Sequence, residues 1–76
     1  MPHVIVKLYS GRSEKEKARL AQEITKAVVT AVGAGEDAIS VGIEDVEPKD
    51  WAEKVYKPDI ISKPATIYKK PGYKPL

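Results

Sequence analysis

The sequence predicts an α/β fold: a single β-α-β unit with parallel strands, followed by a short second helix and a C-terminal tail. Three stretches support this prediction. Residues 3–9 and 38–46 follow the alternating pattern of strands, and residues 14–32 repeat apolar side chains every three or four positions. A helix of this length carries the chain back along the sheet, so the second strand should run parallel to the first with a right-handed crossover.

The first strand is expected over His3–Tyr9. Val4, Val6 and Leu8 fall on one of its faces, while the other face carries Ile5 among polar side chains. Because both faces contain apolar residues, both should be covered. The predicted helix covers one face, and in so short a chain the second cover should be another subunit.

A turn at residues 10–13 leads into the helix, which is expected over Glu14–Val32. Ser13 and Glu16 have the spacing of a capping box, in which each side chain accepts a hydrogen bond from the other residue's backbone N–H. Gly33 suits the left-handed conformation that often ends a helix. The buried stripe of this helix is expected to consist of Leu20, Ala21, Ile24, Ala27, Val28 and Ala31.

A second, shorter helix is expected after the second strand. Pro48 suits its first turn, because the proline nitrogen needs no partner there. The helix should run through Trp51 to about Tyr56, and Pro58 should stop it.

The chain after Pro58 shows no clear period. Residues 59–63 fit a helical turn and residues 65–69 fit a short strand, and the pattern leaves both open. Residues 69–73, Lys-Lys-Pro-Gly-Tyr, form a turn-rich tail that is expected to pack on a partner subunit.

Length and composition restrict the class of protein. The 76 residues should form one domain, 1–76, and a chain of this size buries only about 60% of the surface that it exposes when unfolded. It has no cysteine and no metal-ligand spacing around His3, so self-association is the remaining source of stability. The net charge of +2 is too small to indicate nucleic acid or membrane partners. No export signal is recognised, and a cytoplasmic location is expected.

Pro2 stands directly before the first strand. If the initiator Met1 is removed, as is usual before a small residue, Pro2 presents a free secondary amine. A free α-amine titrates at about 7.7–8.0 in model peptides, and lower when it is desolvated beside a cation, which suits a general base at neutral pH. Met-Pro openings are also common without any function, so Pro2 alone is a weak signal.

The order Pro2, Gly11-Arg12-Ser13, Ser40-Val41 and Trp51 resembles the tautomerase superfamily, of which 4-oxalocrotonate tautomerase is a familiar small member. The resemblance covers nearly the whole chain, and the Trp51 helix and the tail look like those of the pptA-type small tautomerases. It implies the tautomerase/MIF fold, with a homodimer that forms a four-stranded sheet with two helices. Some members stack three dimers into a hexamer; the dimer is favoured here because the longer tail, residues 64–76, should cover the stacking surface.

The resemblance also implies an activity and its residues. It implies a cofactor-independent keto-enol tautomerase, an isomerase, in which Pro2 is base and then acid on a small enol or 2-oxo acid. Arg12 matches an arginine that binds a substrate carboxylate, which a guanidinium fork suits; by itself it reads as a solvated turn residue. Trp51 matches an aromatic wall of the site, and a lone Trp is also a common core anchor. No metal is implied.

Gly42 departs from the family pattern. The best-known member carries an arginine at the matching position, which polarises the substrate carbonyl, and donors of this kind are worth about 3–4 kcal/mol when aimed at developing charge. Its absence argues against the familiar six-carbon dicarboxylate substrate and leaves room for a bulkier, aromatic enol. Lys63, Tyr68 and Lys69 are candidate replacement donors, and the sequence does not choose among them.

Two other functions fit the same residues. A protonated Pro2 could serve as an acid in water addition, as in the hydratase-, dehalogenase- and decarboxylase-like members of the superfamily, although this needs further polar residues to activate water. A chain that keeps Met1 has a blocked Pro2 nitrogen and could be a non-catalytic oligomeric binding protein. The intact mass of the protein distinguishes the last function from the others.

Overall fold

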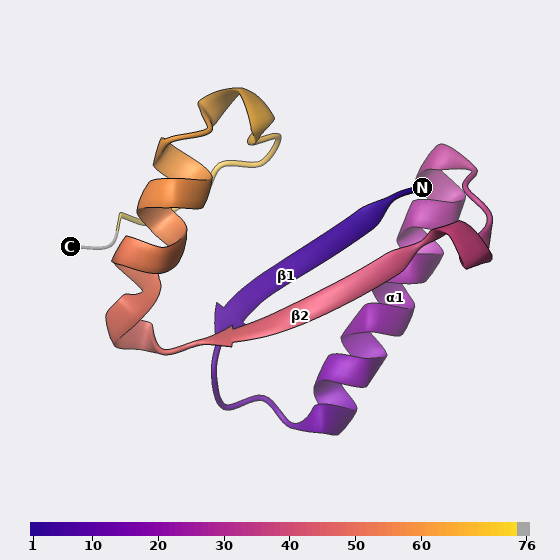
Figure 1. Ribbon diagram of the computed structural model, residues 1–76, viewed down its shortest axis with the longest axis horizontal. Coiled ribbons are helices and arrows are strands. Elements are labelled where there is room, and N and C mark those ends of the chain that lie inside the picture. Colours follow the sequence, from indigo (N-terminus) through magenta and orange to yellow (C-terminus); the bar gives the residue numbers. More distant parts are fainter. Residues whose placement is uncertain (75–76) are drawn as a thin grey trace. The chain divides into compact units, whose positions relative to one another are not determined.

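The computed structural model describes residues 1–74, which belong to two compact units. Unit 1, Met1–Asp45, contains strand β1 (His3–Tyr9), helix α1 (Glu14–Val32) and all but the last residue of strand β2 (Ser40–Val46). The two strands are neighbours in a two-stranded parallel sheet, and α1 lies along one face of it (Figure 1). This is the predicted β-α-β unit, and β1 and α1 have the predicted bounds.

Both ends of α1 are closed by the residues that the sequence indicates. Glu16 N–H donates to Ser13 Oγ over 3.1 Å, and Ser13 N–H donates to Glu16 Oε1 over 3.0 Å, which completes the capping box. The bonds from the Ser13 N–H and hydroxyl lower the pKa of Glu16. At the other end Gly33 adopts φ +73°, and its N–H donates to Val29 O.

The second strand begins two residues later than predicted. Residues Glu36–Ala38 form a 3-10 turn, η1, in which Ala38 N–H donates to Gly35 O. Ile39 N–H also points back, to Glu36 O, at 3.1 Å. Because both amides are used within the loop, the ladder with β1 starts only at Ser40.

The two faces of the sheet differ in their cover. Leu8 of β1 and Leu20 of α1 line the same small cavity, which places Leu8 on the helix side of the sheet. Ile5 and Tyr9 point to the opposite side and remain 52% exposed. The predicted apolar side chains on the second face of β1 are therefore present and uncovered in the single chain.

The core of the chain is thin. Of the predicted stripe on α1, Leu20, Ala21, Ile24 and Val28 are half-buried, whereas Ala27 and Ala31 are exposed. Among the described residues with apolar side chains, only Val55 of unit 2 is buried, at 5% exposure. With so little burial the isolated chain should have only marginal stability, as expected for its length.

Unit 2 begins at Val46 and is built from short helical segments. A 3-10 turn, η2 (Pro48–Asp50), leads into helix η3 (Ala52–Ile61), and a second 3-10 turn, η4 (Pro64–Thr66), precedes the tail. Residues 65–69 do not form the short strand that the sequence left open, because Thr66 and Ile67 donate their N–H groups to Lys63 O and Pro64 O within the turn.

Helix η3 is a π-helix that continues through Pro58, so the prediction that Pro58 stops it is wrong. In an α-helix the proline ring clashes with the carbonyl four residues earlier. The π-turn is wider and its bonds span five residues, as in the 3.0 Å bond from Ser62 N–H to Lys57 O. The wider turn accommodates the ring. Residues 59–61 belong to this helix, in agreement with the helical turn that residues 59–63 fit in the sequence. No helix within residues 1–74 combines the length and apolar character needed to cross a membrane.

Candidate active site

Pro2 is held at the start of the sheet by its main chain. Its carbonyl accepts the Ser40 N–H over 3.2 Å, which ties Pro2 to the first residue of β2. Beside it, His3 Nδ1 and Ser40 Oγ share a hydrogen bond of 2.6 Å. Pro2 is half-buried, whereas the Met1 side chain is fully exposed at 101% and can be lost without loss of packing. The nitrogen of Pro2 therefore has a fixed position at one end of β1.

Arg12 lies in the turn beyond the other end of β1. Its guanidinium Nη1 is 3.6 Å from Glu16 Oε2, and its side chain is 67% exposed. An exposed pair of this kind contributes little to stability. The guanidinium is therefore available to a carboxylate ligand, although the Glu16 pair also fits the simpler role of a solvated turn residue.

Pro2 and Arg12 of one chain do not lie together. All seven residues of β1 separate them, and the six steps of the strand span roughly 20 Å at the usual rise per residue. An arginine side chain cannot bridge this distance to a small molecule in contact with Pro2. Within one chain, the two predicted site residues belong to opposite ends of the sheet.

Trp51 belongs to unit 2, where it anchors the tail. Its Nε1–H donates to the hydroxyl of Tyr73 over 3.0 Å. The ring of Tyr73 in turn packs on Tyr56 of η3, with ring centroids 5.8 Å apart and an interplanar angle of 43°. This aromatic cluster supports the role of Trp51 as a core anchor of unit 2, and Tyr56 and Tyr73 were not anticipated in it.

Gly42 lies in the middle of β2. A Cβ placed on it would meet no atom within 4 Å, so a side chain at this position has open space. The glycine is thus not required by a close approach of another part of the described chain.

Two polar groups of unit 1 were missed from the sequence. The first is the His3–Ser40 bond, whose only signal is the position of both residues at the starts of predicted strands. The second is Lys17, which pairs with Asp45 of β2 at 2.9 Å and with Glu14 at 2.7 Å. The hydrogen bonds to Asp45 and Glu14 raise the pKa of Lys17. This network joins α1 to β2, far from Pro2 along β1.

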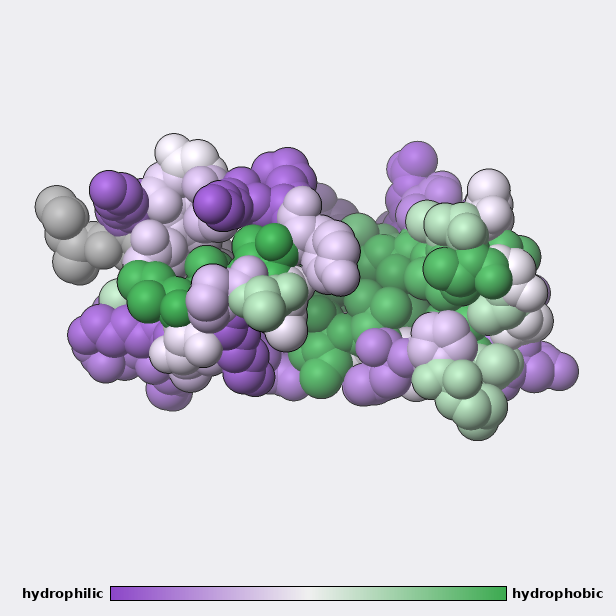
Figure 2. Space-filling model, turned by 90° about the horizontal axis from the view of Figure 1, so that it is seen from above, coloured by the Kyte–Doolittle hydropathy of each residue, from purple (hydrophilic) through white to green (hydrophobic). Residues whose placement is uncertain are grey.

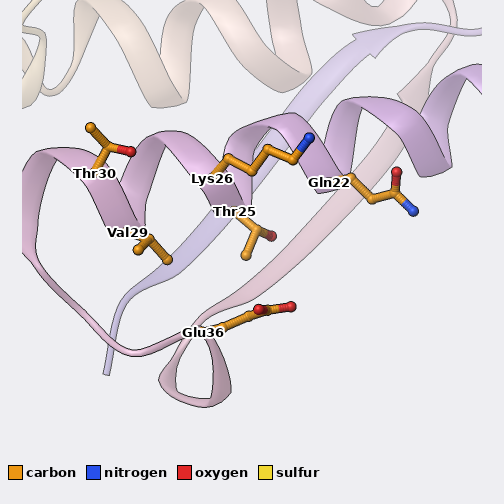
Figure 3. Close-up of a pocket in the computed structure, with 6 residues that line it drawn as sticks. All are labelled: Gln22, Thr25, Lys26, Val29, Thr30 and Glu36. Carbon is orange, nitrogen blue, oxygen red and sulfur yellow. The ribbon is translucent and has the colours of Figure 1, made fainter.

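A cavity of about 480 Å³ lies between α1 and η1. Thr25, Val29 and Lys26 of the helix and Glu36 of the loop are among its lining residues (Figure 3). None of the three predicted site residues lines it. In the described part of the chain, no group of three or more His, Asp or Glu side chains is placed to hold a metal ion.

Comparison with known proteins identifies the family. The family model for tautomerases, described as tautomerase enzymes, matches residues 2–55. A protein of Xylella fastidiosa named "Probable tautomerase" is 41% identical over 73 residues, which cover 96% of this chain and 89% of the relative. Tautomerase PptA of Pectobacterium carotovorum is 35% identical over 74 residues, which cover 96% and 97% of the two chains.

A solved structure shares the fold. It is described as one of the 4-oxalocrotonate tautomerase isozymes from Methylibium petroleiphilum. It superposes with a TM-score of 0.64 at 34% identity, over 66% of this chain and 81% of the other. The chain therefore belongs to the tautomerase family, a family of isomerases.

Proposed function

We propose that the protein is a cofactor-independent keto-enol tautomerase that uses the Pro2 nitrogen, freed by removal of Met1, as base and then acid. The observation that carries the proposal is the anchoring of Pro2. Its carbonyl is bonded to Ser40 N–H at 3.2 Å, and its half-buried ring stands at the start of a strand. An amine that is fixed and partly desolvated has a lowered pKa, which suits proton transfer near neutral pH.

The reaction needs only one group that takes and returns a proton. The neutral Pro2 amine accepts the hydroxyl proton of an enol, and the resulting ammonium delivers a proton to the carbon, which gives the ketone. The first step adds one proton to the enzyme and the second removes one, so the two steps together leave its proton count unchanged. General acid–base catalysis of this kind contributes typically about 10²–10⁴-fold.

Arg12 is proposed to bind the substrate carboxylate at the Pro2 of a second copy. The length of β1, roughly 20 Å, supports a site in which these two residues come from different chains. A two-fold pairing of the free edge of β1 with its copy is antiparallel, and it brings the far end of one β1 beside the start of the other. Arg12 of each chain then comes next to Pro2 of its partner.

The same pairing supports a homodimer. A two-stranded sheet is too narrow to be stable alone, whereas pairing gives four strands with two helices. Ile5 and Tyr9 leave an apolar face that a lone chain exposes. Sedimentation equilibrium at micromolar concentration should give a dimer. A folded monomer would contradict the assembly, whereas a hexamer would contradict only the prediction that the tail covers the surface on which dimers stack.

Trp51 is proposed to form an apolar wall of the site, and residues 1–76 to act as one domain in the cytoplasm. The relatives support the single domain, because their similarity extends over 96% of the chain and so includes both units. The bond from Trp51 to Tyr73 supports a rigid wall, because it fixes the indole.

The substrate is proposed to be a bulky enol with one carboxylate, such as phenylenolpyruvate. The open space at Gly42 supports this, because the position lacks both a second cation and a side chain that would fill the site. The six-carbon dicarboxylate enol should be a poorer substrate. Comparison of kcat/KM for the two substrates checks this preference.

The test of the mechanism combines mass, titration and turnover. The intact mass should show loss of Met1, and an NMR titration of the Pro2 nitrogen should give a pKa below that of a free amino terminus. Pro2→Ala keeps an amine but makes it primary, and ketonisation of phenylenolpyruvate should be lost. Full activity in Pro2→Ala, or a retained Met1 in active protein, would refute Pro2 as the base.

A further inference from the structure

Unit 2 contains a small apolar cavity between η3 and the tail. Its volume is about 230 Å³, and Tyr56, Ile60, Ile67, Pro71, Lys70 and Lys74 are among the residues that line it. Figure 2 shows hydrophobic side chains at the surface of unit 2, on the left of the view, with hydrophilic ones around them. The volume is below the roughly 300–1,000 Å³ of pockets that hold drug-sized ligands, so the cavity suits a single ring or a short chain.

The charge around this cavity has one sign. Residues 60–76 contain four lysines and no acidic residue: Lys63, Lys69, Lys70 and Lys74. Within residues 1–74 these four form no ion pair. The lysines of η3 differ, because Lys54 pairs with Asp50 at 3.6 Å and Lys57 pairs with Glu53.

We propose that this cavity binds a small organic anion with an apolar body, such as an aromatic monocarboxylate. The ring of the ligand lies against Ile60 and Ile67, where it removes apolar surface from water. Its carboxylate meets the ammonium groups of Lys70 and Lys74 at the rim, which no carboxylate of the described chain occupies. A neutral ligand of the same shape leaves both lysines unpaired.

The proposal is independent of the role of Pro2. Every residue that it uses belongs to unit 2, and binding is read without turnover. The two can therefore fail separately. Pro2→Ala should bind the anion at this cavity as the wild type does, even where its tautomerase activity is lost.

The experiment is an NMR titration of the full-length, ¹⁵N-labelled protein at low salt. Phenylacetate is the probe, and phenylacetamide and acetate are its neutral and ring-free analogues. Phenylacetate should shift the amide signals of Ile60, Ile67 and Lys70 and bind at least about fivefold more tightly than either analogue. A higher salt concentration should weaken the binding of phenylacetate and leave the affinity for phenylacetamide nearly unchanged.

A pair of double variants with equal charge supplies the control. Lys70→Gln with Lys74→Gln should weaken phenylacetate by about fivefold or more. Lys54→Gln with Lys57→Gln removes the same charge from lysines that are already paired, and should change the affinity less than about twofold. Equal weakening by the two double variants, equal affinity for phenylacetate and phenylacetamide, or shifts confined to residues 1–45 would overturn the proposal.

Discussion

Mixing two defective variants tests whether one site takes Pro2 and Arg12 from different chains. Pro2→Ala removes the base, and Arg12→Ala removes the carboxylate partner. If the residues come from different chains, random 1:1 mixing leaves half of the sites with Pro2 and, independently, half with Arg12. About one quarter of all sites is then complete, in a dimer or in a larger ring.

The size of each defect follows from the structure. Strand β1, which spans roughly 20 Å, separates Arg12 from Pro2 of its own chain, so a complete site is expected to need both chains. Loss of a bidentate pair to a carboxylate costs about 1.5–3 kcal/mol, which corresponds to a fall of roughly 10- to 150-fold in kcat/KM. A neutral analogue of the substrate should lose much less.

The assay is ketonisation of phenylenolpyruvate per mole of chain, after the variants are unfolded and refolded together. The mixture should reach about one quarter of the wild-type rate, well above the mean of the separate variants. The matched control is wild type mixed 1:1 with a chain that carries both Pro2→Ala and Arg12→Ala. If the site is shared between chains, this mixture should also reach about one quarter of the wild-type rate, whereas a site built within one chain would give about one half. A mixture no faster than its separate components would refute the shared site.

Four further predictions follow from unit 1. Ser13→Ala breaks the capping box and should lower the free energy of unfolding by about 1 kcal/mol in a urea titration. The pKa of Glu16 is lowered from 4.5, so its stabilisation is present above pH 4.5 and lost as the pH falls through the folded value; Glu16→Gln should reduce this acid dependence. The pKa of Lys17 is raised from 10.5, so its stabilisation is present below pH 10.5 and lost as the pH rises through the folded value. Lys17→Met should therefore reduce the fall in the free energy of unfolding at alkaline pH. An unchanged fall at alkaline pH would contradict the Asp45 contact. The Cβ of Gly42→Arg would meet no atom within 4 Å, and this variant should raise kcat/KM for the dicarboxylate enol relative to phenylenolpyruvate. An unchanged ratio would show that Gly42 lies outside the site.

The sequence was sufficient for the elements that depend on neighbouring residues. The bounds of α1 follow from Ser13 and Glu16 at one end and Gly33 at the other, because capping bonds join residues at most four positions apart. The bounds of β1 follow from its alternation and from the turn after it. Because one helix connects the two strands, the chain pattern already indicates that they run parallel with a right-handed crossover.

Local signals failed where a residue's effect depends on its surroundings. Pro58 reads as a helix stop, yet the wider π-turn of η3 accommodates its ring. The start of β2 depends on where the amides of Ala38 and Ile39 find their partners, which a pattern of side chains does not show.

The candidate site depended most on the tertiary structure. Pro2, Arg12 and Trp51 could be selected from the sequence because of their order, but a motif carries no distances. Only the folded chain places Pro2 against Ser40, puts Arg12 at the opposite end of β1, and ties Trp51 to Tyr73 in a separate unit. These relations join residues up to 38 positions apart in sequence, and chain folding, not local propensity, decides which of them meet.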